Sequence, residues 1–363
     1  MRQFNVMDLF SGVGGLSYGF SKLQFFNILI ANEIEKDISI AYTLNHPSVE
    51  MLNCDIGDIT KEELTKRLKG NKIDIIVGGP PCQSYSTLGK RQMDKRASLF
   101  LQYKRILELV NPTAFVFENV VGILSMNKGK LFNDVQTEFS KLGYQLKYKV
   151  LDAADYGVPQ HRERVILVGF KDQNAFSFPN TTHGIGNHPY VTLKEAIGDL
   201  PVLKSGEESK EYKHKPNNEF LQFVRGESDS TLTEHKAPKS GKSLIKIMNA
   251  LKDGESKMDL PEEIRPKSGY GNTYAKLWWD RPSTTITRNF ACPSSSRCIH
   301  PRDSRAMTIR EGARLQSFPD NYIFYGSDGM KRLEIGNAVP PLLSIALANQ
   351  MISALDSYYR TAI

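Results

Sequence analysis

Cysteine is scarce in this sequence, and its four residues are widely scattered. They are Cys54, Cys82, Cys292 and Cys298. So few cysteines in a chain of 363 residues exclude a disulfide framework and indicate a reducing compartment. Zinc is not expected, because Cys292 and Cys298 lack a usual ligand spacing and no fourth ligand joins them and His300. We therefore expect no metal.

Long apolar runs are also absent. The longest apolar stretch, Leu342–Leu355, is interrupted by Asn349 and Gln350, so we expect no membrane span. The first residues have no apolar core of the signal-peptide type and run directly into a strand-like segment. These two absences lead us to expect a cytoplasmic protein without a membrane partner.

Positive charge exceeds negative charge, with a formal net charge of +7. The excess is concentrated in two stretches. Residues 90–105 contain six lysines and arginines against one aspartate, and residues 297–314 contain five arginines against two acidic residues. Two cationic stretches near candidate site segments favour a nucleic acid as the partner.

Strand-like and helix-like segments alternate in the first half of the chain. The strand-like segments are Phe4–Phe10, Phe26–Asn32, Ile73–Gly78, Ala114–Phe117 and Val165–Phe170. This alternation predicts an α/β fold with a doubly wound, mostly parallel sheet. Residues 172–280 are rich in polar residues, glycine and proline, and helical patterns return after them. We predict a first domain at 1–171, a smaller loop-rich domain at 172–280, and a return segment at 281–363 that completes the first domain.

One cysteine follows a predicted strand on a rigid loop. Ile73–Gly78 leads into Gly79-Pro80-Pro81-Cys82-Gln83-Ser84, where two prolines restrict the backbone before the thiol. Open α/β sheets bind ligands and carry out chemistry at the carboxyl ends of their strands. The position suits a nucleophile, although a structural cysteine in a turn is equally consistent with this hexapeptide.

Charged residues adjoin two other predicted strands. Glu118 follows Ala114–Phe117, which places its carboxylate at the same sheet edge as Cys82. Arg162 and Arg164 precede Val165–Phe170 and share one face of that strand, as an ordinary surface pair also would.

The first strand-to-helix turn is rich in small residues. It reads Phe10-Ser11-Gly12-Val13-Gly14-Gly15-Leu16, a pattern that lets a ligand approach the backbone closely. Ser17 replaces the third glycine of the dinucleotide pattern, which argues against a nicotinamide-dependent oxidoreductase. Glu33, at the end of the second strand, is placed to accept hydrogen bonds from ribose hydroxyls or to cap the next helix.

These segments together resemble the cytosine-5 DNA methyltransferase family of bacterial restriction-modification systems. The matching segments, in the family's order, are Asp8–Gly15, Glu33, Asp55-Ile56, Pro80–Gln83, Glu118–Val120, Gln160–Arg164, Arg281–Thr287 and Gly336–Pro340. The resemblance covers the chain except about residues 172–280. It implies a Rossmann-like catalytic domain that uses S-adenosylmethionine, and a target-recognition domain at 172–280.

The resemblance also implies catalytic roles. Cys82 would add as a thiolate to carbon 6 of a flipped cytosine, whose carbon 5 then takes the methyl group. Glu118 would contact ring nitrogen 3 and the exocyclic amine of the base. Arg164 would reach the carbonyl oxygen of the base and steady Glu118, and Arg162 would hold phosphate or position the loop.

The implied methyl donor is S-adenosylmethionine, with S-adenosylhomocysteine as the product. The residues that the resemblance assigns to the donor site are Phe10, Gly12, Gly14, Leu16, Glu33, Ile34, Asp55, Ile56, Pro80, Leu99, Asn337 and Val339.

Double-stranded DNA is the implied partner. The basic stretch after Ser86 resembles the mobile loop that closes over DNA in this family, and DNA contacts are assigned to Gln83, Ser84, Ser86, Lys90 and Arg91. We expect a monomer, and a cognate restriction endonuclease that acts on the same site without direct contact. Two alternatives stay open: a tRNA cytosine-5 methyltransferase and a catalytically silent nucleic-acid binding module.

Overall fold

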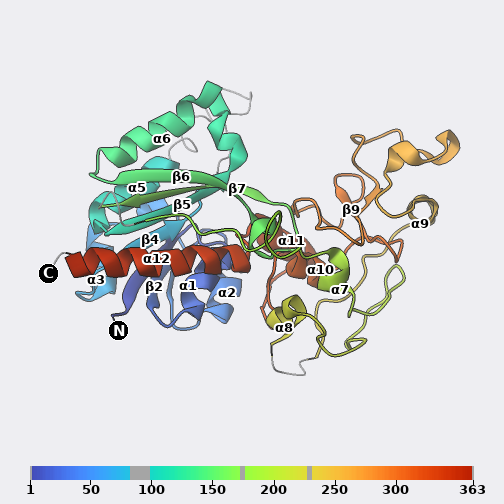
Figure 1. Ribbon diagram of the computed structural model, residues 1–363, viewed down its shortest axis with the longest axis horizontal. Coiled ribbons are helices and arrows are strands. Elements are labelled where there is room, and N and C mark those ends of the chain that lie inside the picture. Colours follow the sequence, from blue (N-terminus) through green and yellow to red (C-terminus); the bar gives the residue numbers. More distant parts are fainter. Residues whose placement is uncertain (1, 82–98, 172–175, 227–230, 362–363) are drawn as a thin grey trace. The chain divides into compact units, whose positions relative to one another are not determined.

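The computed structural model describes residues 2–81, 99–171, 176–226 and 231–361. Contacts divide the chain into two compact units (Figure 1). Unit 1 comprises Met1–Asp152, Glu163–Asn180 and Leu343–Ile363, and unit 2 comprises Ala153–Arg162 and Thr181–Leu342. The packing therefore differs from the expected boundaries, because residues 281–342 belong to unit 2 and only Leu343–Ile363 return to unit 1.

Unit 1 is built around a seven-stranded sheet with the order β3-β2-β1-β4-β5-β7-β6. The strands are β1 (Phe4–Leu9), β2 (Phe26–Asn32), β3 (Glu50–Leu52), β4 (Ile75–Gly78), β5 (Ala114–Val120), β6 (Gln145–Asp152) and β7 (Glu163–Phe170). All pairings in this sheet are parallel except those of β7, which runs antiparallel to both β5 and β6. The predicted doubly wound, mostly parallel sheet is confirmed.

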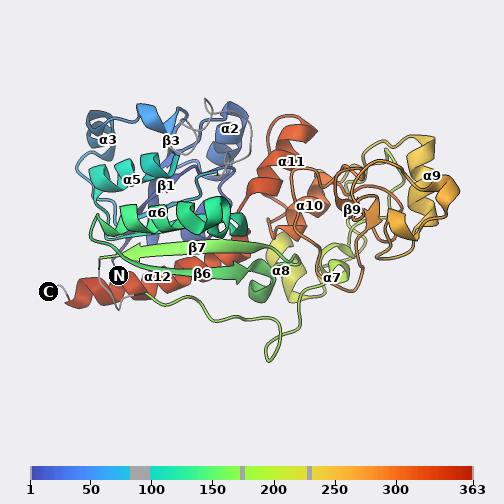
Figure 2. The ribbon, with the colours of Figure 1, turned by 90° about the horizontal axis from the view of Figure 1, so that it is seen from above.

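Helices cover both faces of this sheet. They are α1 (Gly15–Lys22), α2 (Lys36–Asn45), α3 (Lys61–Leu68), α5 (Leu99–Val110), α6 (Lys130–Ser140) and α12 (Pro341–Thr361). Apolar side chains of α3, α5 and α6 pack with one face of the strands in a single core that contains Ile76, Tyr103 and Phe139. Figure 2 shows α6 and α12 on opposite sides of the sheet.

The last helix returns to unit 1 and lies against α1. By length and hydropathy, the stretch Asp328–Arg360 would also pass as a membrane span, but it is largely buried within the protein. The backbone nitrogen of Gly19 donates to Ser344 Oγ at 3.0 Å. A Cβ at Gly19 would stand 2.3 Å from the backbone of Ser344, so this helix crossing requires glycine in α1.

Two strands of the sheet were not expected from the sequence. β3 has only three residues, and β6 is an edge strand with exposed Lys147 and Lys149. Charged side chains on an edge strand disfavour pairing with another chain, and they also remove the apolar alternation by which a strand is predicted.

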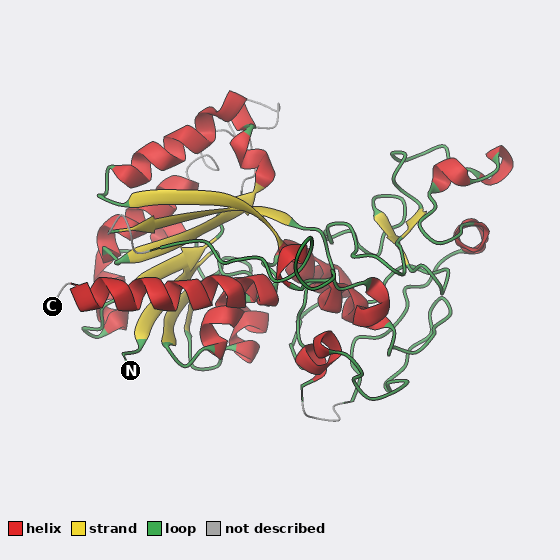
Figure 3. Cartoon of the chain, viewed as in Figure 1, coloured by secondary structure: helices red, strands yellow, loops and turns green. Residues whose placement is uncertain are grey.

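Unit 2 is rich in loops, as Figure 3 shows. Its helices are α7 (Leu193–Ile197), α8 (Glu219–Arg225), α9 (Lys242–Ala250), α10 (Ile309–Leu315) and α11 (Asp328–Asn337). Two short strands, β8 (Ala275–Lys276) and β9 (Arg297–Ile299), pair in parallel. The loop-rich character predicted for residues 172–280 is therefore found, and it extends past residue 280.

Three arginines of the second cationic stretch are fully buried in unit 2. Arg305, Arg310 and Arg314 have no exposed surface. Arg305 pairs with Glu311 at 2.7 Å, and Arg314 pairs with both Asp199 and Asp320. Burial alone would raise the pKa of the Glu311 carboxyl, but Arg305 holds that pKa below its usual range. The interpretation of residues 297–314 as a nucleic-acid surface is wrong for these three residues, because they neutralise buried carboxylates.

Two members of the first cationic stretch also have structural partners. Lys104 pairs with Glu138 at 2.8 Å, and Arg105 donates to the backbone carbonyl oxygens of Ile56 and Ile59. The other four cations of residues 90–105 lie outside the described residues. Glu138 therefore offsets the charge of Lys104, whereas Arg105 keeps its charge and is held in place by backbone oxygens.

Candidate active site

The turn after β1 adopts the left-handed conformations that a close ligand approach requires. Phe10, Gly12 and Gly14 have φ angles of 54°, 55° and 95°. The backbone nitrogen of Ser11 donates to Asn32 at the end of β2, and the nitrogen of Gly14 donates back to Ser11. Glycine tolerates positive φ without strain, so the small residues of this turn have a conformational reason.

Glu33 is bound to the glycine turn by its carboxylate. Oε2 accepts a hydrogen bond from the nitrogen of Gly12 at 3.0 Å, and Oε1 accepts one from the nitrogen of Glu35 at 2.9 Å. Burial raises the pKa of the Glu33 carboxyl, although these backbone hydrogen bonds act in the opposite direction. Each oxygen has a second lone pair, so the helix-capping role and the role towards a ribose are compatible.

The glycine turn has the features of an adenosyl-donor cradle. No atom lies within 4 Å of the position that a Cβ on Gly12 would take, so the backbone there is open to a ligand. Ser11 is buried, and its hydroxyl has no hydrogen-bond partner within the described part of the chain. An open backbone beside an unsatisfied hydroxyl and a fixed carboxylate fits a nucleoside with polar edges.

Most residues assigned to the donor lie in unit 1 near the carboxyl ends of its strands. Leu16, Ile56 and Pro80 are buried, Phe10 and Leu99 are half-buried, and Ile34 is 58% exposed. Asp55 caps a 3-10 turn by accepting from the nitrogen of Gly57 at 2.8 Å. Asn337 and Val339 belong to unit 2, so their assignment to the donor stays a prediction.

Glu118 and Arg164 form an ion pair on neighbouring strands. The Nε of Arg164 lies 2.8 Å from Oε1 of Glu118, and each side chain is 12% exposed. Arg164 stands opposite Val120, two residues beyond Glu118, which makes the pair diagonal neighbours across β5 and β7. This ion pair holds the Glu118 carboxylate, while the roles of both residues towards the base stay predictions.

Gly79 provides the space that the Glu118 carboxylate occupies. A Cβ on Gly79 would stand 2.5 Å from Oε2 of Glu118. Real Cβ atoms do not approach other atoms so closely, so the carboxylate holds its position only because residue 79 is glycine. The carboxylate thus lies directly beside the segment that leads into Cys82.

Asn119 was not singled out by the sequence reasoning, although it lies within one of the matching segments. Its side chain is buried, and Nδ2 donates to the carbonyl oxygen of Pro80 at 3.0 Å. Its Oδ1 accepts from the nitrogen of Val120. Asn119 therefore ties the end of β5 to the proline segment before Cys82, and its place directly after Glu118 was the available signal.

Arg162 has a structural environment within unit 2. Its side chain is 1% exposed, and its two terminal nitrogens donate to the carbonyl oxygens of Ile286 and Gly336 at 2.9 Å each. Of the two roles expected for it, this environment favours positioning the backbone over holding phosphate. Gln160 acts in the same way, since its amide joins Ile286 to Leu315.

A buried polar network lies behind the glycine turn. Asp8 has no exposed surface, and its Oδ2 accepts a hydrogen bond from the Ser17 hydroxyl, which lies 2.7 Å from the Tyr42 hydroxyl. Burial raises the pKa of the Asp8 carboxyl from 3.8 to about 7, and the charge of Glu33 acts in the same direction. The first matching segment therefore begins with a carboxyl that retains its proton more readily than an exposed one.

Several predicted site residues lie outside the described residues. They are Cys82, Gln83, Ser84, Ser86, Lys90 and Arg91.

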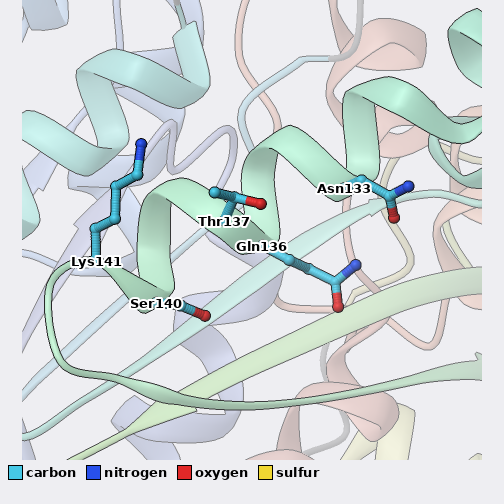
Figure 4. A pocket seen from close by; sticks show the side chains of 5 residues that line it. All are labelled: Asn133, Gln136, Thr137, Ser140 and Lys141. Atoms are coloured by element: carbon cyan, nitrogen blue, oxygen red, sulfur yellow. The ribbon is translucent and has the colours of Figure 1, made fainter.

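Elsewhere, a hollow of about 650 Å³ lies along one face of α6 (Figure 4). Its lining is Asn133, Gln136, Thr137, Ser140 and Lys141. No histidine, cysteine or carboxylate lines this hollow to activate the hydroxyls of Thr137 and Ser140, and no group of three possible metal ligands is found among the described residues.

Comparisons with known proteins agree with this geometry. A sequence model described as C-5 cytosine-specific DNA methylase matches residues 4–353. The chain is similar to the type II methyltransferase M1.HphI of Haemophilus parahaemolyticus, at 35% identity over 95% of this chain and 86% of the relative. It is 37% identical to the type II methyltransferase M.DdeI of Desulfomicrobium norvegicum, over 96% of this chain and 88% of the relative.

A solved structure of a DNA methyltransferase has the same fold as this chain. It is described as a DNA modification methyltransferase encoded within a prophage, from E. coli, and superposes with a TM-score of 0.80. The match covers 98% of this chain and 100% of that chain, at 26% identity. With the family model matching nearly the whole sequence and two relatives above 30% identity, the chain belongs to the C-5 cytosine-specific DNA methylase family.

Proposed function

We propose that this protein methylates carbon 5 of one cytosine within a specific duplex DNA sequence, through a covalent bond between Cys82 and the flipped base. The observation that carries the proposal is the Glu118 carboxylate, held by Arg164 and accommodated by Gly79 beside the segment that leads into Cys82. A carboxylate held beside the residues that precede Cys82 supports a role for Glu118 as proton donor or hydrogen-bond partner in the proposed reaction.

The residues have distinct tasks in the proposed reaction. The Cys82 thiolate forms a bond to carbon 6, and the π electrons of the C5–C6 bond move toward carbon 5. Glu118 holds a proton at ring nitrogen 3, where charge develops as the sulfur adds, and Arg164 fixes the direction of the carboxylate. After carbon 5 has been methylated, its proton leaves and the electron pair that returns to C5–C6 expels the sulfur.

The methyl donor of this family is S-adenosylmethionine, which supplies an electrophilic methyl group when bound. Glu33 and the backbone from Phe10 to Gly14 would hold its nucleoside, since the turn is open at Gly12 and the Ser11 hydroxyl has no hydrogen-bond partner among the residues that the structure describes. Ile34, Asp55 and Ile56 would border the base. We propose no metal in the reaction.

The type II relatives favour a role in restriction and modification. On that basis we infer a cognate endonuclease that cuts the same unmethylated site, a monomeric enzyme, and a cytoplasmic location where the DNA is. The tRNA alternative is not favoured, because the relatives above 30% identity are named as type II methyltransferases. A silent binding module is disfavoured by the intact Glu118–Arg164 pair.

The direct test measures transfer of a labelled methyl group to duplex DNA and to RNA. Wild-type protein is expected to label duplex DNA, Cys82→Ala to label none, and Cys298→Ala, a buried cysteine of β9, to retain transfer. A duplex with 5-fluorocytosine at the target should trap the wild type covalently. Label found only in RNA would refute the DNA substrate, and full activity of Cys82→Ala would refute the covalent mechanism.

A further inference from the structure

The strand ends that carry Glu33 and Asp55 continue side by side after the ladder of the sheet stops. The pairing of β2 with β3 ends at Asn32, opposite Leu52. Glu33 follows on one strand end, and Cys54 and Asp55 follow on the other. The nitrogen of Glu33 donates to the carbonyl oxygen of Leu52 at 3.2 Å. Side chains supply the further hydrogen bonds between the two segments.

Two asparagines join these segments reciprocally. Nδ2 of Asn32 donates to the carbonyl oxygens of Leu52 and Cys54, at 2.9 Å each. Nδ2 of Asn53 donates in the other direction, to the carbonyl oxygens of Glu33 at 2.8 Å and Ile34 at 3.0 Å. All four acceptors are carbonyl oxygens, so each side-chain amide must turn its nitrogen toward them. We call Asn32 and Asn53, with these four hydrogen bonds, the asparagine clasp.

Asn32 also connects the clasp to the glycine turn. It is 2% exposed, and its backbone carbonyl oxygen accepts from the nitrogen of Ser11 at 3.0 Å. One buried asparagine therefore contacts the glycine turn and both strand ends, which are the segments proposed to hold the donor. Replacing a buried amide removes hydrogen bonds from a site without water and costs stability as well as position. Asn53, which is exposed, is therefore the better residue for a test.

The base end of the donor site is a short turn that needs support from outside. The 3-10 turn Ile56–Asp58 has three residues, and the hydrogen-bond geometry of such turns is poor. Arg105 of α5 donates to the carbonyl oxygens of Ile56 and Ile59, at 2.6 Å and 2.7 Å. These bonds fix the turn to α5, whereas the clasp joins the residues before the turn to Glu33. The separation of the ribose side from the base side of the site therefore depends on the clasp.

We propose that Asn32 and Asn53 are positioning residues for the methyl donor, and that they set the span between a ribose at Glu33 and the edge of adenine at Asp55. The inference rests on the donor site of the proposed function and deepens it. One oxygen of Asp55 accepts from the nitrogen of Gly57, and the second oxygen is available to the exocyclic amine of adenine. Hypoxanthine has a carbonyl oxygen in place of that amine, so a correctly placed Asp55 rejects it. Selection of adenine therefore depends on the span that the clasp sets.

The test measures the binding of two ligands and does not require catalysis. S-adenosylhomocysteine and S-inosylhomocysteine are titrated by calorimetry into the wild type, Asn53→Asp and Asn53→Ala. Asn53→Asp keeps the size of the side chain but turns a carboxylate toward two carbonyl oxygens. The wild type should prefer S-adenosylhomocysteine, and each variant should bind this ligand about tenfold more weakly while its affinity for S-inosylhomocysteine stays the same. The matched control is Asn71→Ala, because this exposed asparagine donates to the carbonyl oxygen of Leu68 at the end of α3; it should change neither affinity.

The possible outcomes separate the clasp from the proposed function. Wild-type affinity for S-adenosylhomocysteine in both Asn53 variants would refute the positioning role. An equal loss for the two ligands, or the same loss in Asn71→Ala, would also refute it, because either result indicates general destabilisation. A wild type that binds neither ligand would overturn the donor site and this inference together. A wild type that binds S-adenosylhomocysteine but transfers no methyl group to any duplex would overturn the DNA methylation alone, and the binding results would still decide the role of the clasp.

Discussion

Replacing Gly79 with alanine tests how the residue after β4 positions the Glu118 carboxylate, which we propose acts in catalysis. The new Cβ would stand 2.5 Å from Oε2 of Glu118, roughly 1 Å inside ordinary contact distance. The carboxylate is the end of a side chain that can rotate, so we expect the variant to fold. Relief of the clash moves Glu118 away from its 2.8 Å contact with Arg164.

The expected effect falls on the chemical step. A displacement of about 1 Å in a group that acts on the reacting base reduces the rate by about 100-fold, equivalent to about 2.7 kcal/mol in the activation free energy. Affinity for the methyl donor should stay unchanged, because Gly12 and Glu33 are not altered. The loss should therefore lie in the single-turnover rate constant, with little change in the melting temperature.

Single-turnover methyl transfer to duplex DNA measures this effect, with donor binding and melting temperature measured on the same samples. Gly122→Ala is the matched control, because the nearest atom to its added Cβ would be a Val120 methyl group at 4.0 Å. A wild-type single-turnover rate constant in Gly79→Ala would refute the reasoning, as would an equal loss in Gly122→Ala.

Two further predictions concern buried charge. Arg314→Leu removes the buried partner that Asp199 and Asp320 share, and leaves them only the longer contacts to Arg225 at 3.3 Å and Arg310 at 3.5 Å. It should destabilise unit 2 by about 3 kcal/mol, measured by urea unfolding. Arg302→Leu, at an exposed position, should cost less than about 1 kcal/mol, and equal costs in the two variants would contradict the structural role of Arg314. The pKa of Asp8 is raised from 3.8 to about 7, so the folded protein keeps a proton that the unfolded chain releases. Its contribution to stability is complete below pH 4 and is lost as the pH rises to 7. The free energy of unfolding of the wild type, relative to that of Asp8→Asn, should therefore fall by a few kcal/mol over this pH range, at about 1.4 kcal/mol for each pKa unit. The measurement is the urea unfolding midpoint of both proteins at several pH values. A difference between the two midpoints that stays constant with pH would contradict the raised pKa of Asp8.

The sheet of unit 1 was predictable where its strands are buried. β1, β2, β4, β5 and β7 are mainly apolar, because a strand covered on both faces favours apolar residues. β6 escaped prediction because its lysines face solvent at the edge of the sheet. β8 and β9 were also not predicted, because strands of two and three residues are too short to show an alternation of apolar and polar residues.

The arginines show where local sequence misleads. Five arginines within residues 297–314 have the composition of a phosphate-binding surface, yet Arg314 is paired with Asp199, 115 positions away in the chain. Burial of an arginine depends on such distant partners, which a charge count does not contain. Arg162 is similar, because its partners are backbone carbonyl oxygens of residues 286 and 336.

The sequence by itself determined the family, the order of the site segments and the identity of the chemical groups. Strand ends, a glycine turn and a cysteine after two prolines are local features, and the chemistry of each side chain follows from its type. The tertiary structure decided which of these groups meet: Glu118 with Arg164 and Gly79, Asn119 with Pro80, and Arg162 with the backbone of residues 286 and 336. Such contacts depend on strand pairing between distant segments, which is set by the packing of the whole unit and not by any short stretch of sequence.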